Sequence, residues 1–162
     1  MMRLQLKHIV SLVVAIAIPL IVGGLGGIAT ASSIPTWYRT LEKPTWNPPD
    51  WIFGPVWTLL YTLMGVALWL VWRLGWDNPQ VRRALLLFGV QLLFNLLWSL
   101  IFFGLRRPDW ALLEIVVLWV LILATATQFY RLQPVAGWLL VPYQLWGTFA
   151  AALNAAIWWL NR

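Results

Sequence analysis

The sequence predicts an all-α integral membrane protein, a bundle of five transmembrane helices. Of its 162 residues, 62% are hydrophobic and only 10% are charged. The mean hydropathy of +0.78 is too high for a domain whose surface faces water. The charged residues lie between long uncharged runs, and each run has the length that crosses a bilayer. We therefore treat residues 1–162 as a single membrane domain.

The first apolar run allows two interpretations. Its basic start, with Arg3 and Lys7, and the Ala-Thr-Ala sequence at 29–31 are typical of a secretory signal peptide with a cleavage site. The alternative is a first spanning helix at about 8–30. We favour the helix because the uncharged stretch from Ile9 to Tyr38 is longer than a signal peptide needs.

Residues 31–50 are expected to form a loop that leads into the second helix. Three prolines between residues 44 and 49 remove backbone donors and push their preceding residues out of the helical region. Asp50 is expected to serve as the N-cap of a helix at 51–72. The 22 residues of this helix are uncharged and are followed by Arg73, so the helix is long enough to span a bilayer.

Charges and prolines bound the other spans in the same way. Pairs of arginines bracket the third run, Glu114 interrupts the fourth, and Pro142 is expected to kink the first turns of the fifth. The expected helices are 84–105, 110–131 and 137–160. Basic residues divide six to five between the two sides, so their distribution does not determine the orientation.

Helical spacing places small, polar and aromatic residues on common faces of these helices. Trp57 and Tyr61 share a face of the second helix, Asn95 and Trp98 one of the third, and Trp146, Phe149, Ala150 and Leu153 one of the fifth. Together these faces would enclose a cavity rich in indole and poor in charge. Interhelical hydrogen bonds alone are the alternative for Asn95, and an interfacial aromatic belt is the alternative for the tryptophans.

Composition excludes several kinds of site. The chain has no cysteine and one histidine, His8, so thiolate chemistry and a histidine-based metal site are excluded and no metal ligands are assigned. The scattered basic residues form no patch for nucleic acid. Glu114 has no second carboxylate or histidine at a useful spacing, and we expect it near the membrane interface rather than in general-acid catalysis.

One stretch carries a family resemblance. The pattern WYxxLxKPxWxPPxWxFGPVWxxLYxxMG, which begins at Trp37 and ends at Gly65, resembles the signature of the translocator-protein family, the TspO or tryptophan-rich sensory proteins. The similarity continues through Gln91, Asn95, Trp98, Trp110, Trp146 and Asn154, and so covers about residues 20–160.

The resemblance implies a binding site for flat hydrophobic ligands, namely porphyrins, haem and other tetrapyrroles, with sterols and drug-like aromatics bound by relatives. No cofactor is required. The 31–50 loop resembles a lid over the pocket. The ligand-binding residues that the resemblance and the helical faces predict are Trp37, Pro44, Trp46, Phe53, Gly54, Val56, Trp57, Tyr61, Asn95, Trp98, Trp110, Trp146, Phe149, Ala150 and Leu153.

Three functions remain open at this point. The first is binding, transport or sensing of porphyrins. The second is light-dependent oxidative breakdown of bound porphyrin, an activity proposed for bacterial members of the family, for which Trp57 and Trp146 would be the reactive residues. The third is a membrane scaffold that needs no ligand. Ala155 replaces the tyrosine of the animal cholesterol motif, which favours a prokaryotic envelope membrane over an organellar outer membrane.

We also expect a homodimer. Relatives in the family are dimeric, and small residues offer faces for close helix packing. Gly23 and Gly27 form a GxxxG pair, for which a flexible kink near Pro19 is the alternative explanation, and Ala84 and Gly89 provide a second small-residue face.

Overall fold

The computed structural model describes residues 2–162, with side chains from residue 6 onward, and this part of the chain is all-helical without strands. The prediction of an all-α fold is confirmed. Each of the long helices has 20 residues or more, and a short helix precedes the last of them. The helices are α1 (Met2–Ser33), α2 (Phe53–Trp72), α3 (Pro79–Ser99), α4 (Pro108–Leu132), α5 (Pro134–Leu139) and α6 (Val141–Leu160).

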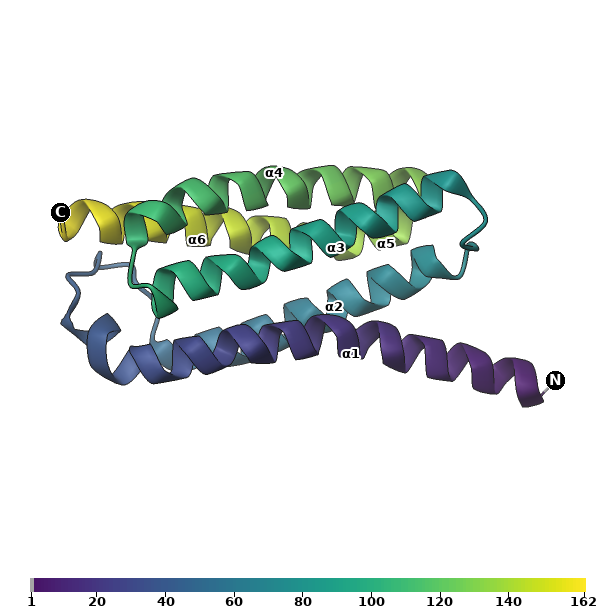
Figure 1. The fold of residues 1–162 in the computed structure, drawn as a ribbon, viewed down its shortest axis with the longest axis horizontal. Coiled ribbons are helices and arrows are strands. Elements are labelled where there is room, and N and C mark those ends of the chain that lie inside the picture. Colours follow the sequence, from purple (N-terminus) through teal and green to yellow (C-terminus); the bar gives the residue numbers. More distant parts are fainter. Residues whose placement is uncertain (1) are drawn as a thin grey trace.

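The long helices run side by side in alternating directions (Figure 1). α1 packs mainly against α2 and α3, while α4 packs against α3 and α6. α2 and α6 are not a closely packed pair, although both face the interior. The start of α1 and the end of α6 lie at opposite ends of the bundle (Figure 1). The segment between α1 and α2 lies at the same end as the C-terminus (Figure 1).

Four segments of the described chain are long and apolar enough to cross a membrane. Their bounds are Leu6–Tyr38, Asp50–Trp72, Pro79–Gly104 and Pro108–Leu132. Large aliphatic side chains such as Ile9, Ile21 and Ile28 on α1 lie on the outer surface, where lipid can cover them. The chain is thus a multi-pass membrane protein.

The first helix is longer than the expected range of 8–30. It begins by Met2 and continues past Ser33 as a π-helix, η1 (Ile34–Tyr38), so that the loop begins near residue 41 rather than at 31. Pro35 explains the change of helix type. A proline ring clashes with the carbonyl four residues earlier, and the wider π-turn relieves that clash without ending the helix.

Two other helix starts differ from the expectation. α3 begins at Pro79 rather than 84, because the Asn78 side chain accepts a 2.9 Å hydrogen bond from the Gln80 amide and caps the helix. Asp50 makes no capping hydrogen bond. It is itself the first residue of a short 3₁₀-helix, η2 (Asp50–Ile52), which follows Pro49 and leads directly into α2.

The expected helix at 137–160 is broken near its start. α5 ends at Leu139, and α6 begins at Val141 with Pro142 in its first turn. Proline is tolerated at the first positions of a helix because those amides have no intrahelical partner. Pro142 therefore begins a new helix instead of kinking a continuous one.

Glycines allow α1 and α2 to pack closely within one chain. A methyl group built on Gly65 would lie 2.9 Å from the Ala15 carbonyl oxygen and would overlap the Ile16 backbone. One built on Gly23 would overlap the Tyr61 ring. Gly23 is therefore used for packing inside the bundle, whereas Gly27 is exposed and has no atom within 4 Å of an added methyl group.

The contact at Gly65 generates a stability prediction. We expect Gly65→Ala to lower the free energy of unfolding by about 1–3 kcal/mol, because the backbone of α1 cannot move aside as a flexible side chain could. Gly89→Ala on α3 is the matched control, since no atom lies within 4 Å of the added methyl group. Thermal unfolding in mild detergent should show a lower Tm for Gly65→Ala alone. Equal Tm values for the two variants would contradict the close contact.

Candidate functional site

Two π-helices meet at the end of the bundle that holds the α1–α2 loop. η1 extends α1, and η3 (Leu100–Gly104) extends α3. The Ser33 hydroxyl donates a 2.7 Å hydrogen bond to the Phe103 carbonyl oxygen and joins the two segments. The rings of Tyr38 and Phe103 are 5.7 Å apart, and those of Trp98 and Phe102 are stacked at 5.3 Å. The two π-helices therefore form a rigid aromatic end wall.

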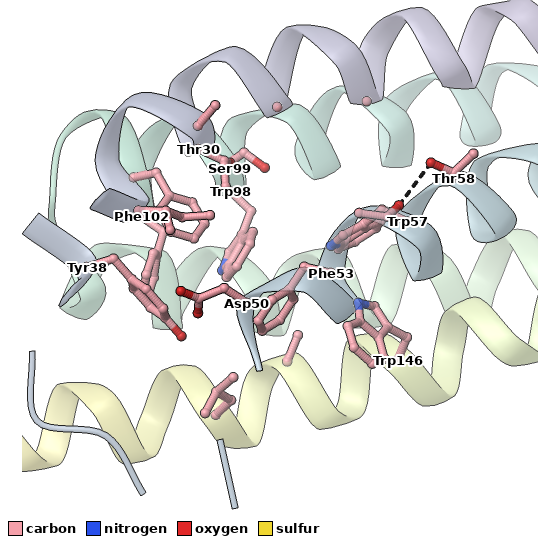
Figure 2. A pocket seen from close by; sticks show the side chains of 18 of the residues that line it. Thr30, Tyr38, Asp50, Phe53, Trp57, Thr58, Trp98, Ser99, Phe102 and Trp146 are labelled. Atoms are coloured by element: carbon pink, nitrogen blue, oxygen red, sulfur yellow. Dashed lines mark hydrogen bonds between the residues drawn. The ribbon is translucent and has the colours of Figure 1, made fainter. Parts of the chain in front are cut away.

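Next to this wall lies an internal cavity of about 450 Å³. It occupies the space that α2 and α6 leave between them, and α1 and the end of α3 close its other sides (Figure 2). Glycines and other small side chains of α1 line one wall, while aromatic rings cover most of the others. The ring-bearing residues on its surface are Tyr38, Phe53, Trp57, Tyr61, Trp98, Phe102, Phe103, Trp146 and Phe149.

The aromatic side chains hold one another in place. Trp57 stacks on Tyr61 with ring centres 5.3 Å apart, and it meets Trp146 edge-to-face at 6.5 Å and 89°. Phe53 in turn contacts Trp146 edge-to-face at 6.0 Å. Such offset and perpendicular arrangements are the favourable ones for aromatic pairs. The cavity thus has walls of fixed rings on which a planar aromatic molecule can stack.

A buried hydrogen-bond network lies at the inner end of the cavity. The Tyr61 hydroxyl donates to Asn95 Oδ1 at 2.6 Å, and Asn95 Nδ2 donates to the Tyr143 hydroxyl at 2.9 Å. Asn95 is only 3% exposed and lines a separate small void of about 10 Å³ rather than the main cavity. Its contacts are the interhelical hydrogen bonds that the sequence left open as an alternative.

A second amide connects the cavity wall to α4. The indole Nε1 of Trp98 donates to Asn154 Oδ1 at 3.1 Å, while Asn154 Nδ2 donates to the Pro108 carbonyl oxygen at 2.8 Å. Asn154 thereby holds the Trp98 ring and the first turn of α4 against α6. The amide of Gln91, which is 1% exposed, has no hydrogen-bond partner among the described residues.

The loop at 41–49 lies against the mouth of the cavity. Trp46 meets Phe149 edge-to-face at 5.8 Å, and the Tyr38 hydroxyl donates to Asn47 Oδ1 at 3.0 Å. Asn161 makes two 2.9 Å hydrogen bonds to the backbone of Glu42, one to its amide and one to its carbonyl oxygen. The loop is therefore attached both to η1 and to the end of α6.

The structure brings most of the predicted ligand-binding residues to this cavity and leaves others outside it. Those on its surface are Phe53, Gly54, Trp57, Tyr61, Trp98, Trp146, Phe149, Ala150 and Leu153. Trp37, Pro44, Trp46, Val56 and Asn95 do not line it, although Trp37 packs on Phe102 and Trp46 on Phe149. Trp110 is 59% exposed, and the Arg107 guanidinium lies 5.9 Å from its ring. Trp110 lies on the outer surface in the first turn of α4, where its neighbour Ala111 is the buried residue.

Sequence reasoning missed the contribution of α1 and the polar anchors. Leu20, Gly23, Gly27 and Ile34 line the cavity at helical spacing, and this spacing was a signal for an inward face of α1. The roles of Tyr143 and Ser33 had no comparable signal, because each depends on a partner 48 or 70 residues away in the chain.

The carboxyl group of Glu114 is packed within the bundle near the N-terminal end of α4. Both of its carboxyl oxygens are buried, and neither has a hydrogen-bond partner among the described residues. It does not line the cavity. The described part of the chain contains no group of acidic residues and histidine that could hold a metal ion.

The fold and this site define a class, the multi-pass membrane proteins with an aromatic cavity inside a helix bundle. Within that class the sequence matches the TspO/MBR family over residues 15–160, and the chain belongs to this family. The family resemblance of the tryptophan-rich stretch is thereby confirmed.

Individual relatives from bacteria, archaea and animals support the assignment. The chain is 44% identical to the tryptophan-rich protein TspO of Chlorobaculum tepidum over 155 residues, which cover 96% of this chain and 98% of that protein. The TspO of Archaeoglobus fulgidus is 43% identical, with 95% and 99% covered. The translocator protein of Homo sapiens is 41% identical over 123 residues, 75% of this chain and 73% of that protein.

The Asn95 network generates a second stability prediction. Asn95→Leu leaves the hydroxyl groups of Tyr61 and Tyr143 without this partner, and we expect a loss of about 1–3 kcal/mol. Tyr143→Phe added to Asn95→Leu should cost little more, because one unpaired hydroxyl group is removed with it. Thermal unfolding of the single and double variants tests the coupling. Strictly additive losses would show that Asn95 and Tyr143 do not interact.

Proposed function

We propose that this protein binds porphyrins and other flat hydrophobic ligands inside its helix bundle and thereby transports or senses them. The observation that carries the proposal is the 450 Å³ cavity walled by stacked and edge-to-face rings. Its volume lies within the range of about 300–1000 Å³ that is typical of sites for small molecules. Stacking on indole faces favours planar aromatic molecules, and sterols and drug-like aromatics fit the same apolar walls.

The position of the cavity favours exchange of ligand from one side of the membrane. We propose five membrane crossings, in which α5 and α6 together form the fifth, because their combined length with the intervening residue is sufficient. The cavity then lies near one membrane surface, beneath the 41–49 loop, which serves as its lid. A prokaryotic envelope membrane is the proposed location.

Porphyrin photo-oxidation is a second candidate function. Trp57 and Trp146 both line the cavity and are in edge-to-face contact, with ring centres 6.5 Å apart. An excited porphyrin bound there would touch two oxidisable indoles, which supports this candidate. Bleaching under light that stops without oxygen would support turnover, whereas tight binding without bleaching would support binding alone.

A ligand-independent scaffold is the remaining alternative, and it predicts no saturable binding.

Homodimerisation stays part of the proposal. The exposed face of α3 around Gly89, with Leu86, Val90 and Leu93, is available for a second chain, whereas Ala84 is buried.

The experiment that decides between ligand binding and a scaffold is a tryptophan-fluorescence titration of the purified protein with protoporphyrin, haem and a sterol in parallel. Failure of all three to bind saturably would contradict the proposed function.

The position of Trp146 generates a prediction about affinity. We expect Trp146→Phe to keep the fold and to weaken porphyrin binding roughly three- to tenfold, because a phenyl ring offers less stacking surface. Trp110→Phe is the matched control, since Trp110 lies outside the cavity. Titration of both variants with protoporphyrin measures the effect. An equal loss in the two variants, or no loss in Trp146→Phe, would remove Trp146 from the site.

Ala150 allows a steric test on the same helix. Leucine there would add volume at the cavity wall, which we expect to cost about 1–3 kcal/mol of binding free energy, tenfold or more in affinity. Ala152→Leu introduces the same side chain at an exposed position of α6 and should leave affinity unchanged. Porphyrin titration and Tm are measured for both. Unchanged affinity in Ala150→Leu would place the ligand elsewhere.

A further inference from the structure

The cavity surface carries one charged side chain among the described residues that line it. This residue is Asp50, the first residue of η2, at the start of the second span. Figure 2 shows its carboxyl group among the labelled rings, on the side of the cavity where Tyr38 lies. The side chain is exposed, and so it is accessible to a ligand at the mouth.

Among the residues whose side chains are described, none forms an ion pair with this carboxylate. The only ion pair among the described residues joins Arg107 to Asp109, at a different place in the chain. Lys43, the basic residue on the neighbouring loop, lies with its ammonium 4.7 Å from the centre of the Tyr38 ring and donates to the Leu41 carbonyl oxygen. Lys43 does not line the cavity. At the mouth of the cavity the Asp50 carboxylate is therefore accessible and has no ion-pair partner among the described residues.

The deeper walls offer donors rather than charges. The indole nitrogens of Trp57 and Trp146 have no acceptor among the described residues, whereas that of Trp98 is bonded to Asn154. In Figure 2 the Trp57 nitrogen lies at the ring edge that points toward Trp98. An apolar interior of this kind rejects charged groups, because removing a charge from water is costly without a partner. A ligand with one charged edge must leave that edge at the mouth, beside Asp50.

We propose that Asp50 selects ligands by charge, so that the cavity prefers flat aromatic molecules whose outer edge is cationic or neutral over those whose outer edge bears carboxylates. This inference rests on the proposed function and specifies its ligand class. Ring nitrogens or carbonyl groups on the inner edge of such a ligand would accept hydrogen bonds from the free indoles. A dicarboxylate porphyrin would be bound less tightly than its ester.

The test uses one macrocycle with three kinds of side chain: protoporphyrin IX with its two carboxylates, its dimethyl ester, and the analogue with two primary amines. Affinities are measured by tryptophan quenching in the same neutral detergent, at low and high salt. The proteins are the wild type, Asp50→Asn and the control Asp77→Asn. Asp77→Asn makes the same chemical change in the turn between α2 and α3, at the opposite end of the bundle (Figure 1).

In the wild type we expect the diamine to bind most tightly and the dicarboxylate least tightly. Asp50→Asn should reduce the ratio of their dissociation constants on the order of three- to tenfold, the size expected when one exposed attraction to the diamine and one exposed repulsion of the dicarboxylate are lost. High salt should reduce the same ratio in the wild type. Affinity for the neutral ester should be unchanged, and Asp77→Asn should behave as the wild type.

Two results would overturn the selection by charge while leaving the proposed function intact. One is an unchanged diamine-to-dicarboxylate ratio in Asp50→Asn. The other is an equal change in affinity for all three porphyrins, which would give Asp50 a structural role at the start of η2. If none of the three binds the wild type saturably, the proposed function itself fails, and the two failures are thereby distinguished.

Discussion

The amide of Asn95 ties together three helices that would otherwise be free to close on the cavity. It accepts from Tyr61 on α2 and donates to Tyr143 on α6, and its own helix is α3. In a membrane, lipid gives no hydrophobic force between helices, so packing and interhelical hydrogen bonds carry the association. Because one planar amide sets both distances, α2 and α6 are held at a fixed separation at the inner end of the cavity. The cavity can then stay open toward the 41–49 loop.

Close packing elsewhere compensates for this open region. Gly65 lets α2 approach the backbone of α1, and Gly23 accommodates the Tyr61 ring. Below the cavity, buried residues of α2, α3 and α4 form a continuous apolar core with Phe88 and Phe129 stacked at 5.7 Å. The bundle is thus dense at one end and hollow at the other.

Hydropathy and proline positions were sufficient to predict where the long helices lie along the chain, although not their bounds, because the bilayer sets their length and few charges interrupt the runs. Helical spacing also identified the faces that carry Trp57, Trp146 and Ala150. The tertiary pairings could not be predicted this way, since nothing local distinguishes Trp98, which lines the cavity, from Trp110, which faces outward. The π-helix η1 was missed for a related reason. A proline such as Pro35 usually ends a helix, whereas here the wider π-turn accommodates it and the Ser33 hydroxyl joins the segment to η3.

The two hydrogen bonds between Asn161 and the backbone of Glu42 fix the 41–49 loop to the end of the last helix. A single side-chain amide pairs with both the N–H and the C=O of one residue, as a neighbouring strand would. The same Asn161 amide also donates to the Ile157 carbonyl oxygen in the last turn of α6. One side chain therefore joins residue 42 of the loop to the last turn of α6, in which Ile157 lines the cavity. Two segments more than a hundred residues apart in the chain are fixed to each other at this point, so the position of the loop depends on the end of the last helix.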